Sequence, residues 1–396
     1  MAREQRNESF KVWGLRDNPF ASLPPANEEE RQHVFTGRQA EVEKLINLVE
    51  RPRGIFLVGL FGVGKSILAL ETLRLLNQKG SITAYAKYDR EFGFTKSALK
   101  KLATACAKHD HEAVYRTLMR GGDGGRRERI DQKDIVEAVY NIKSGMAAIE
   151  DIAQIFRKPE VRTTFVIVVD DLDKGTDIGN INQIIQDTRQ LVELGCAVIL
   201  PGHPFGSTAG FSSSADVLNP VTIEPLSEPE LVEMMGKYLD LARQFSSTEL
   251  ELSPFTLDAA HLIANGIAEF GLTPRIFNFA CQLLLEEAAD EGVSSVTHQF
   301  VAERWGKIAK DFLMRSLHDN DKRHLKIIYE NGGLLSEDAR EPIKQIGGEF
   351  AEYSQVRTIL TKLIQENILI ESVEEGKRKM SPNPLITGND NIFIIR

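Results

Sequence analysis

The sequence predicts an α/β fold, with a doubly wound parallel sheet over about residues 36–225, an all-α segment after it and a C-terminal winged helix. Apolar runs at 55–58, 165–169 and 197–200 alternate with stretches of helical spacing, which is the order found in doubly wound domains. These runs are continuously apolar, as expected of parallel strands that are buried on both faces. From about residue 226 helical spacing dominates, until strand-like runs return near the C-terminus.

Four segments follow from these changes in pattern. The leader is expected to be irregular, because Asn18-Pro19 and Pro24-Pro25 are turn signals. The second segment opens with an amphipathic helix and contains the sheet. Its expected strands are 55–58, 82–88, 165–169, 197–200 and 221–223, and a mainly helical stretch covers 95–158. The expected boundaries are 1–35, 36–225, 226–313 and 314–396.

The last two segments differ from each other in pattern. The helical one begins at Ser227, where Glu230 completes a capping box and Pro229 lies in the first turn. In the final segment, two helical stretches precede two strand-like ones, and this order predicts a winged helix-turn-helix. The stretches are helices at 324–330 and 355–366, a strand at 368–373, a charged tip at 374–379 and a strand at 392–395.

A phosphate-binding motif lies directly after the first predicted strand. Residues 59–66 read Gly-Leu-Phe-Gly-Val-Gly-Lys-Ser, a full match to G-x-x-x-x-G-K-[ST] between a strand and a helix. Backbone N–H groups of the loop and of the helix start would face the phosphates of ATP. Lys65 would reach the β- and γ-phosphates, and the Ser66 hydroxyl would hold Mg²⁺. The predicted ATP-binding residues of this P-loop are Gly59, Gly62, Val63, Gly64, Lys65, Ser66 and Ile67.

An acid pair, Asp170-Asp171, ends the apolar run 165–169. Such a pair could simply cap a strand, but the phosphate-binding motif upstream favours a role in catalysis. We expect Asp170 to hold Mg²⁺ through water. Asp171 is expected to orient or deprotonate the attacking water.

Composition limits the remaining classes of function. The formal net charge is −9, so any contact with DNA must come from a local patch. Cys106, Cys196 and Cys281 are isolated in sequence, which favours core thiols in a reducing cytoplasm over disulfides or a zinc site. The sequence shows neither a signal peptide nor an apolar run long enough to cross a membrane, so we expect a cytoplasmic protein with no membrane partner.

Together these motifs make the chain resemble an AAA+ ATPase of the origin-recognition and replication-licensing branch, over about residues 14–310. It is equally similar to bacterial transposition-regulator and secretion ATPases. Besides the loop and the acid pair, three segments carry the resemblance: the leader Gly14–Phe20, the segment Phe35–Arg38 with Glu41, and Gly271–Ile276. The resemblance implies that Arg38 packs beside the nucleotide base. It also implies that Arg275, in a helical lid, senses the γ-phosphate.

Three departures from that branch affect the expected chemistry. Asp171 stands where the branch usually has Glu, and the paired Asp is similar to the signalling STAND and KAP ATPases. The polar sensor after the fourth strand is expected to be His203, although a histidine between two prolines could simply cap a turn. No Lys or Arg occurs between Gln190 and Gly236, where the resemblance would place an arginine finger. We therefore expect an ATPase with slow hydrolysis.

The expected role is an ATP-binding AAA+ switch that couples nucleotide state to homo-oligomer formation and to DNA or a protein partner, such as a nuclease or transposase. The alternatives are a STAND- or KAP-like signalling or defence regulator that acts through protein assembly without DNA, and a nucleotide-binding scaffold that hardly turns over. Residues 314–396 hold 12 basic and 13 acidic residues, a poor electrostatic footprint for DNA. The candidate DNA contacts are Arg357, Lys362, Lys377, Arg378 and Lys379.

Overall fold

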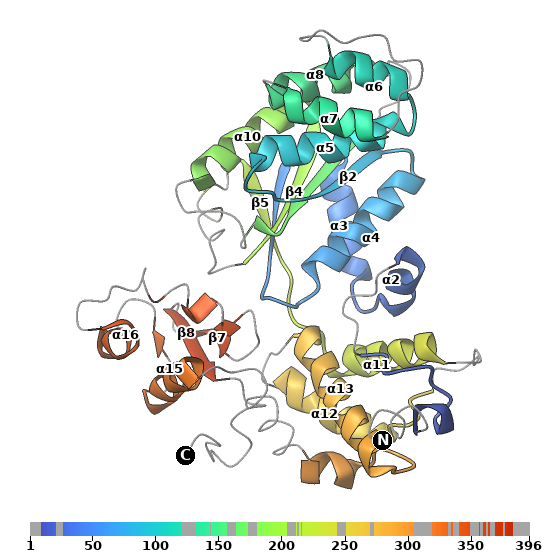
Figure 1. The fold of residues 1–396 in the computed structure, drawn as a ribbon, viewed down its shortest axis with the longest axis vertical. Coiled ribbons are helices and arrows are strands. Elements are labelled where there is room, and N and C mark those ends of the chain that lie inside the picture. The colour runs from blue at the N-terminus through green and yellow to red at the C-terminus, as the bar shows by residue number, and fades with distance from the viewer. Residues whose placement is uncertain are drawn as a thin grey trace. The chain divides into compact units, whose positions relative to one another are not determined.

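The computed structural model divides the chain into two compact units. The first is the α/β unit, 38–59 with 64–224, and the second comprises 1–37, 60–63 and 225–396, so that the division falls twice within the P-loop. Figure 1 shows the fold. The structure describes residues 9–20, 27–119, 132–142, 144–156, 164–172, 180–203, 211, 214, 216–243, 251–269, 273–304, 319–331, 334–335, 340–348, 356, 359–361, 363–364, 369–374 and 377–382.

The α/β unit is built on a five-stranded parallel sheet with the order β2-β3-β4-β1-β5. From β1, inside the sheet, the chain crosses to β2 at one edge. It returns through β3 and β4 to one side of β1 and then reaches β5 at the other edge, as in other doubly wound folds. Every residue of β1, β3 and β4 is buried, which explains their continuous apolar runs. The strands are β1 (Gly54–Val58), β2 (Ile82–Lys87), β3 (Phe165–Asp170), β4 (Cys196–Gly202) and β5 (Leu218–Thr222).

Helices pack against this sheet in two groups. α3 and α4 pack together, and α4 contacts β2, β3 and β4. α5 packs on β2 and β3 and carries α6, α7 and α8, while α10 packs on β4 and β1 (Figure 1). The helices are α3 (Gln39–Val49), α4 (Lys65–Gln78), α5 (Gly93–Ala107), α6 (His111–Leu118), α7 (Gln132–Asn141), α8 (Gly145–Phe156) and α10 (Ile181–Glu193).

The second unit has a helical core to which the leader contributes. α11 (Glu228–Ala242), α12 (Leu257–Glu269) and α13 (Pro274–Glu291) pack around buried side chains. α11 begins with the predicted capping box of Ser227 and Glu230. The leader supplies Phe10, Trp13, Leu15 and Phe20 to this core.

Residues 9–20 are also tied to the helical core by hydrogen bonds. The Trp13 indole Nε1 donates to the Ser294 carbonyl at 3.0 Å, and the Arg16 backbone N–H donates to the Ala242 carbonyl at 2.8 Å. A leader bound through its backbone and its aromatic side chains is part of the unit's fold.

The expectation of an irregular leader was wrong in part. α2 (Glu28–Val34) is a helix, and residues 9–12 are helical too. The Asn27 side chain caps α2 by accepting the Glu30 N–H at 2.7 Å. Three acidic residues in the first turn also stabilise the helix, because their negative charges lie at the positive end of the helix dipole.

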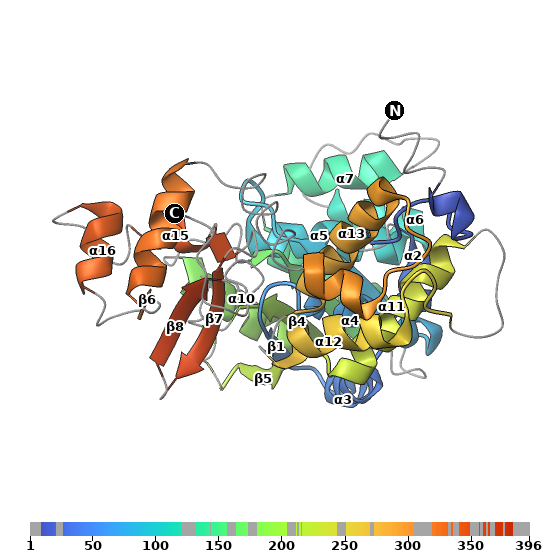
Figure 2. The ribbon, with the colours of Figure 1, turned by 90° about the horizontal axis from the view of Figure 1, so that it is seen from below.

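The C-terminal part of the described chain contains a three-stranded antiparallel sheet with the order β6-β8-β7 (Figure 2). α15 contacts both β8 and α16. Residues 356, 359–361 and 363–364 are helical, within the predicted stretch 355–366. The elements are α15 (Asp319–Glu330), β6 (Leu334–Leu335), α16 (Arg340–Gly347), β7 (Leu369–Glu374) and β8 (Lys377–Pro382).

The position of the second hairpin strand corrects the prediction. β8 begins at Lys377, which pairs with Glu374, so the basic triplet lies within a strand and not at a loop tip. A strand is paired through its backbone and does not require apolar side chains. The apolar pattern therefore gave no sign that a strand begins at the basic triplet 377–379. β6 and α16 were also missed, and the predicted strand 392–395 lies outside the described residues.

Two further observations concern the described residues only. All three cysteines are free and buried, as expected of core thiols, and burial raises the pKa of the Cys106 thiol to about 12. None of the helices in the described ranges is both long and apolar enough to cross a membrane.

Candidate nucleotide site

The P-loop leaves β1 at the carboxyl edge of the parallel sheet. The Gly59 N–H donates to the Gly202 carbonyl at 3.3 Å, which ties the loop start to the end of β4. Gly62 and Gly64 have φ angles of +82° and +104°, in the region that favours glycine. A Cβ on Gly64 would meet none of the described atoms within 4 Å, so glycine is favoured there by its φ and not by a close contact.

The start of α4 is the second part of the site. Gly64 is its N-cap and no side chain caps it, so the first-turn N–H groups have no intrahelical partners. A helix start of this kind binds anions. Lys65 opens the helix, and its Nζ donates to the Gly59 carbonyl at 2.7 Å, which places the ammonium over the loop. These features fit the phosphates of a nucleotide.

Within the second unit, the loop tip lies against the start of α13. A Cβ built on Gly62 would lie 2.6 Å from the Arg275 Cβ and 2.9 Å from the Thr273 Oγ1. Thr273 is the N-cap of α13 and is 4% exposed, and its buried hydroxyl has no hydrogen-bond partner among the residues that the structure describes. Pro274 at the first helical position fixes the direction of the helix start. Gly62 is therefore required both by its φ and by this close approach.

The acid pair follows β3 at the same edge. Asp170 is 6% exposed, and its Oδ1 accepts the Asp171 N–H at 2.7 Å. Asp171 has a φ of +61°, the only positive value among the described non-glycine residues. Asparagine and aspartate tolerate this conformation better than other residues, but it still costs roughly 1–2 kcal/mol.

Two residues of β2 contact the acid pair, and sequence reasoning missed both. The Tyr85 hydroxyl donates to Asp170 Oδ2 and also hydrogen-bonds the Ser66 side chain. The Lys87 Nζ lies 3.5 Å from Asp171 Oδ2 in an ion pair. Burial, and then the charge of Asp170, hold the pKa of the Tyr85 phenol well above its ordinary value, so it remains a donor at neutral pH.

Ser66 and Asp170, the predicted metal residues, are thus linked through one phenol. Their hydroxyl and carboxylate oxygens are the hard ligands that Mg²⁺ prefers, directly or through water. The donor set therefore fits the predicted ion. Among the residues that the structure describes, there is no cluster of three or more His, Cys, Asp or Glu that could hold a metal by itself.

The other predicted site residues lie as follows. His203 directly follows β4 and is 1% exposed, at the same sheet edge as the acid pair. Arg38 is buried, and its guanidinium donates to Glu41 at 2.7 Å and to the Glu224 carbonyl. Arg275 is exposed in the first turn of α13. Gly271 and Leu272 of the predicted lid motif lie outside the described residues.

The candidate DNA contacts are only partly described. Arg357 and Lys362 lie outside the described residues, and Lys377 and Arg378 are placed only as positions in β8. Lys379 is half-buried, and the adjacent Met380 is fully buried.

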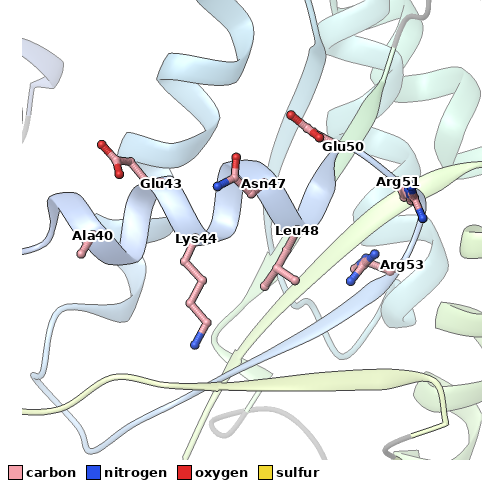
Figure 3. Close-up of a pocket in the computed structure, with 8 residues that line it drawn as sticks. All are labelled: Ala40, Glu43, Lys44, Asn47, Leu48, Glu50, Arg51 and Arg53. Atoms are coloured by element: carbon pink, nitrogen blue, oxygen red, sulfur yellow. The ribbon is translucent and has the colours of Figure 1, made fainter.

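A surface hollow lies along α3, and its lining residues differ from those of the predicted site. Figure 3 shows Lys44 and Leu48 on one side of α3, with Arg51 and Arg53 beyond its end. Its remaining lining residues are Ala40, Glu43, Asn47 and Glu50, and none of the predicted site residues lines it.

Residues 34–194 match the family described as AAA ATPase domain. These residues form an AAA ATPase domain. This identification confirms the AAA ATPase family that the sequence predicted. Together with the parallel sheet, it also confirms the predicted P-loop NTPase fold. It implies nucleotide binding, usually with Mg²⁺, and supports ATPase activity in general.

No curated protein matches the chain. A Walker-type ATPase of Pyrococcus abyssi has a similar structure, with a TM-score of 0.51 and 15% identity over 93% of this chain and 99% of that one. At that identity the similarity shows a shared fold only. Aeropyrum pernix ORC1, solved in complex with DNA, has a TM-score of 0.45 at 18% identity over 91% of this chain and 96% of that one. The Thermotoga maritima RuvB Holliday junction branch migration motor has a TM-score of 0.43 at 15% identity over 88% and 93%.

Proposed function

We propose that this AAA ATPase-domain protein is an ATP-dependent molecular switch with slow hydrolysis. The observation that carries the proposal is the close approach of the loop tip to the start of α13 at Gly62, Thr273 and Arg275. The loop that would cradle the phosphates leaves no room for a side chain between itself and α13. A change in loop conformation on nucleotide binding would therefore be transmitted to that helix.

The roles of the site residues follow the sequence predictions. Lys65 and the N–H groups of Gly59, Gly62, Val63, Gly64 and Ile67 would hold the phosphates, with Arg38 beside the base. Bound Mg²⁺ would neutralise phosphate charge, held by Ser66 and, through water, by Asp170. Asp171 would orient or deprotonate water, Arg275 would sense the γ-phosphate, and His203 would act as the polar sensor.

Slow hydrolysis is supported by the surroundings of Asp171. Its carboxylate is paired with Lys87 at 3.5 Å, so it would have to leave this ion pair to orient the attacking water. The sequence also places no Lys or Arg between Gln190 and Gly236. An arginine finger contributes about 10³–10⁵ in rate in GTPases, so its absence from that interval would leave a long-lived ATP state.

We further propose that the second unit contains an all-α lid and a C-terminal winged helix. The order of elements along the chain supports the winged helix: α15, β6 and α16 come first, then the helical residues within 356–364, then the hairpin of β7 and β8. In the sheet, β8 lies between β6 and β7. The domain boundaries that we propose are those expected from the sequence. In this reading the lid couples ATP to homo-oligomer formation and the winged helix engages DNA or a protein partner such as a nuclease or transposase.

Turnover as a function of protein concentration tests the switch. We expect specific ATPase activity to be low and nearly independent of concentration, with tight binding of a fluorescent ATP analogue. Steeply rising turnover as the pure protein self-assembles would show that a neighbouring subunit supplies a finger. That result would contradict the slow switch.

DNA binding is tested by salt titration with and without ATP. Replacing Lys377, Arg378 and Lys379 together with Ala should weaken binding and reduce the slope of log affinity against log salt by about 0.9 for each lost phosphate contact. The matched control replaces three exposed lysines of the α/β unit, Lys79, Lys101 and Lys108, and should leave the slope unchanged.

A signalling regulator that does not bind DNA is the second candidate. The half-buried Lys379 and the near-neutral charge of 314–396 favour it, because a DNA-binding surface is usually basic and exposed. A wild-type protein without measurable DNA affinity at low salt would favour this candidate.

A further inference from the structure

We propose that Tyr85 is a positioning residue of the metal site, which holds the Asp170 carboxylate and the Ser66 hydroxyl in the arrangement that Mg·ATP requires. The inference rests on the proposed nucleotide site and adds to it a residue from β2, which the phosphate-binding motif and the acid pair do not include. Tyr85 is not expected to touch the reacting atoms.

The strand register explains how Tyr85 reaches Asp170. β2 and β3 are parallel, and Lys87 is the residue opposite Asp170 while Tyr85 is opposite Val168. Tyr85 is therefore a diagonal neighbour of Asp170, about 7–8 Å away between backbones, which only a long side chain spans. Alternation along β2 buries Ile82, Ala84 and Ala86 and turns Tyr85, which is half-buried, to the opposite face.

The hydrogen bonds fix the carboxylate at both oxygens. Asp170 Oδ1 accepts the Asp171 N–H at 2.7 Å, and Oδ2 accepts the Tyr85 hydroxyl. Two donors on different oxygens define the plane of a carboxylate, because rotation about the Cβ–Cγ bond would break both. An ionised carboxylate has about four acceptor sites, so two remain for metal-bound waters.

The same phenol connects Asp170 to the P-loop. Tyr85 also hydrogen-bonds the Ser66 side chain, at the start of α4. The chain Ser66, Tyr85, Asp170 thus joins three segments that are distant in sequence: α4, β2 and β3. Removing the hydroxyl would free both predicted metal residues to rotate, without removing either of them.

Tyr85→Phe tests the proposal, because it removes the hydroxyl and keeps the ring. We would titrate a fluorescent ATP analogue in EDTA and at increasing Mg²⁺, by fluorescence and without turnover. Affinity in EDTA should change by less than about twofold. The Mg²⁺ concentration that gives half of the metal-dependent gain in affinity should rise about tenfold. This is the change in an equilibrium constant that the loss of one hydrogen bond to a charged group produces.

Tyr88→Phe is the matched control, since Tyr88 follows the same strand and is also half-buried. Its hydrogen bond to the Asp170 carbonyl comes from the backbone N–H, which this substitution keeps. Tyr88→Phe should leave the Mg²⁺ dependence unchanged. In an Asp170→Asn background, Tyr85→Phe should have little further effect, because the two residues act as a unit. Tyr85→Met removes the hydroxyl in another shape and provides the same test if the Phe variant does not fold.

The outcomes separate this inference from the proposed site. An unchanged Mg²⁺ dependence in Tyr85→Phe would overturn the positioning role. A lower Mg²⁺ requirement would also overturn it, because the phenol would then compete with the metal for Ser66. A wild-type protein that binds no ATP at all would instead contradict the nucleotide site.

Discussion

The P-loop and the acid pair lie at the same edge of one parallel sheet, yet they are specified in different ways. The loop is specified by contiguous residues, because it works through backbone N–H groups that glycine conformations and a helix start arrange locally. The acid pair works through side-chain oxygens, whose orientation depends on Tyr85 and Lys87 in another strand. A complete motif therefore identifies the loop, whereas the acid pair needs the tertiary structure to define its chemistry.

The largest effect should come from the loop. We expect Lys65→Ala to lower ATP affinity about a thousandfold, because removing one partner of a buried charge pair costs about 4 kcal/mol. The fold should persist, since Lys65 is a half-buried residue at a helix start. Titration with labelled ATP and circular dichroism measure both properties. Unchanged affinity would show that the nucleotide binds elsewhere.

At the acid pair, Asp171→Asn should preserve ATP binding and reduce turnover by about a hundredfold or more, the contribution typical of a general base. The amide has a similar shape but does not take up a proton. Single-turnover hydrolysis and ATP titration on the same sample separate the two properties. If hydrolysis is unaltered while binding is intact, the base is another residue.

The loop tip can be tested without removing a functional side chain. Gly62→Ala should destabilise the protein by about 3 kcal/mol, because a left-handed Ala costs about 1–2 kcal/mol and overpacking adds about as much again. Its Cβ would lie 2.6 Å from the Arg275 Cβ.

Gly80→Ala is the matched control for Gly62→Ala. Gly80 has a similar φ of +87° but open space around its Cβ position, so only the backbone cost of about 1–2 kcal/mol should remain. Chemical denaturation of both variants measures the difference. Equal destabilisation would indicate that α13 does not restrict the loop tip.

The smallest effect is expected at Lys87. Its ammonium pairs with Asp171 but is 71% exposed, so the pair contributes no more than about 1 kcal/mol. Lys87→Gln should therefore raise turnover by at most about fivefold, by releasing the Asp171 carboxylate. Lys101→Gln, at an exposed position of α5, is the control. A decrease in turnover would mean that Lys87 assists the reaction and does not restrain the base.

Much of the fold could be predicted because it depends on local pattern. The five strands of the α/β unit were expected within a few residues of their observed positions. The signal was clearest for β1, β3 and β4, since parallel strands buried on both faces are continuous apolar runs. The errors fall where that signal is weak. α2 depends on a cap and on acidic residues, and β8 begins with Lys-Arg-Lys and is paired through its backbone.

The sequence alone determined the AAA ATPase domain and its phosphate loop, because those features reside in contiguous residues and in the period of apolar side chains. Only the tertiary structure could show that Tyr85 holds Asp170, that Lys87 pairs with Asp171, and that Gly62 lies against Thr273. These contacts depend on which strands are neighbours and on their register. Strand order and register are set by the packing of the whole unit, so a local pattern cannot specify them.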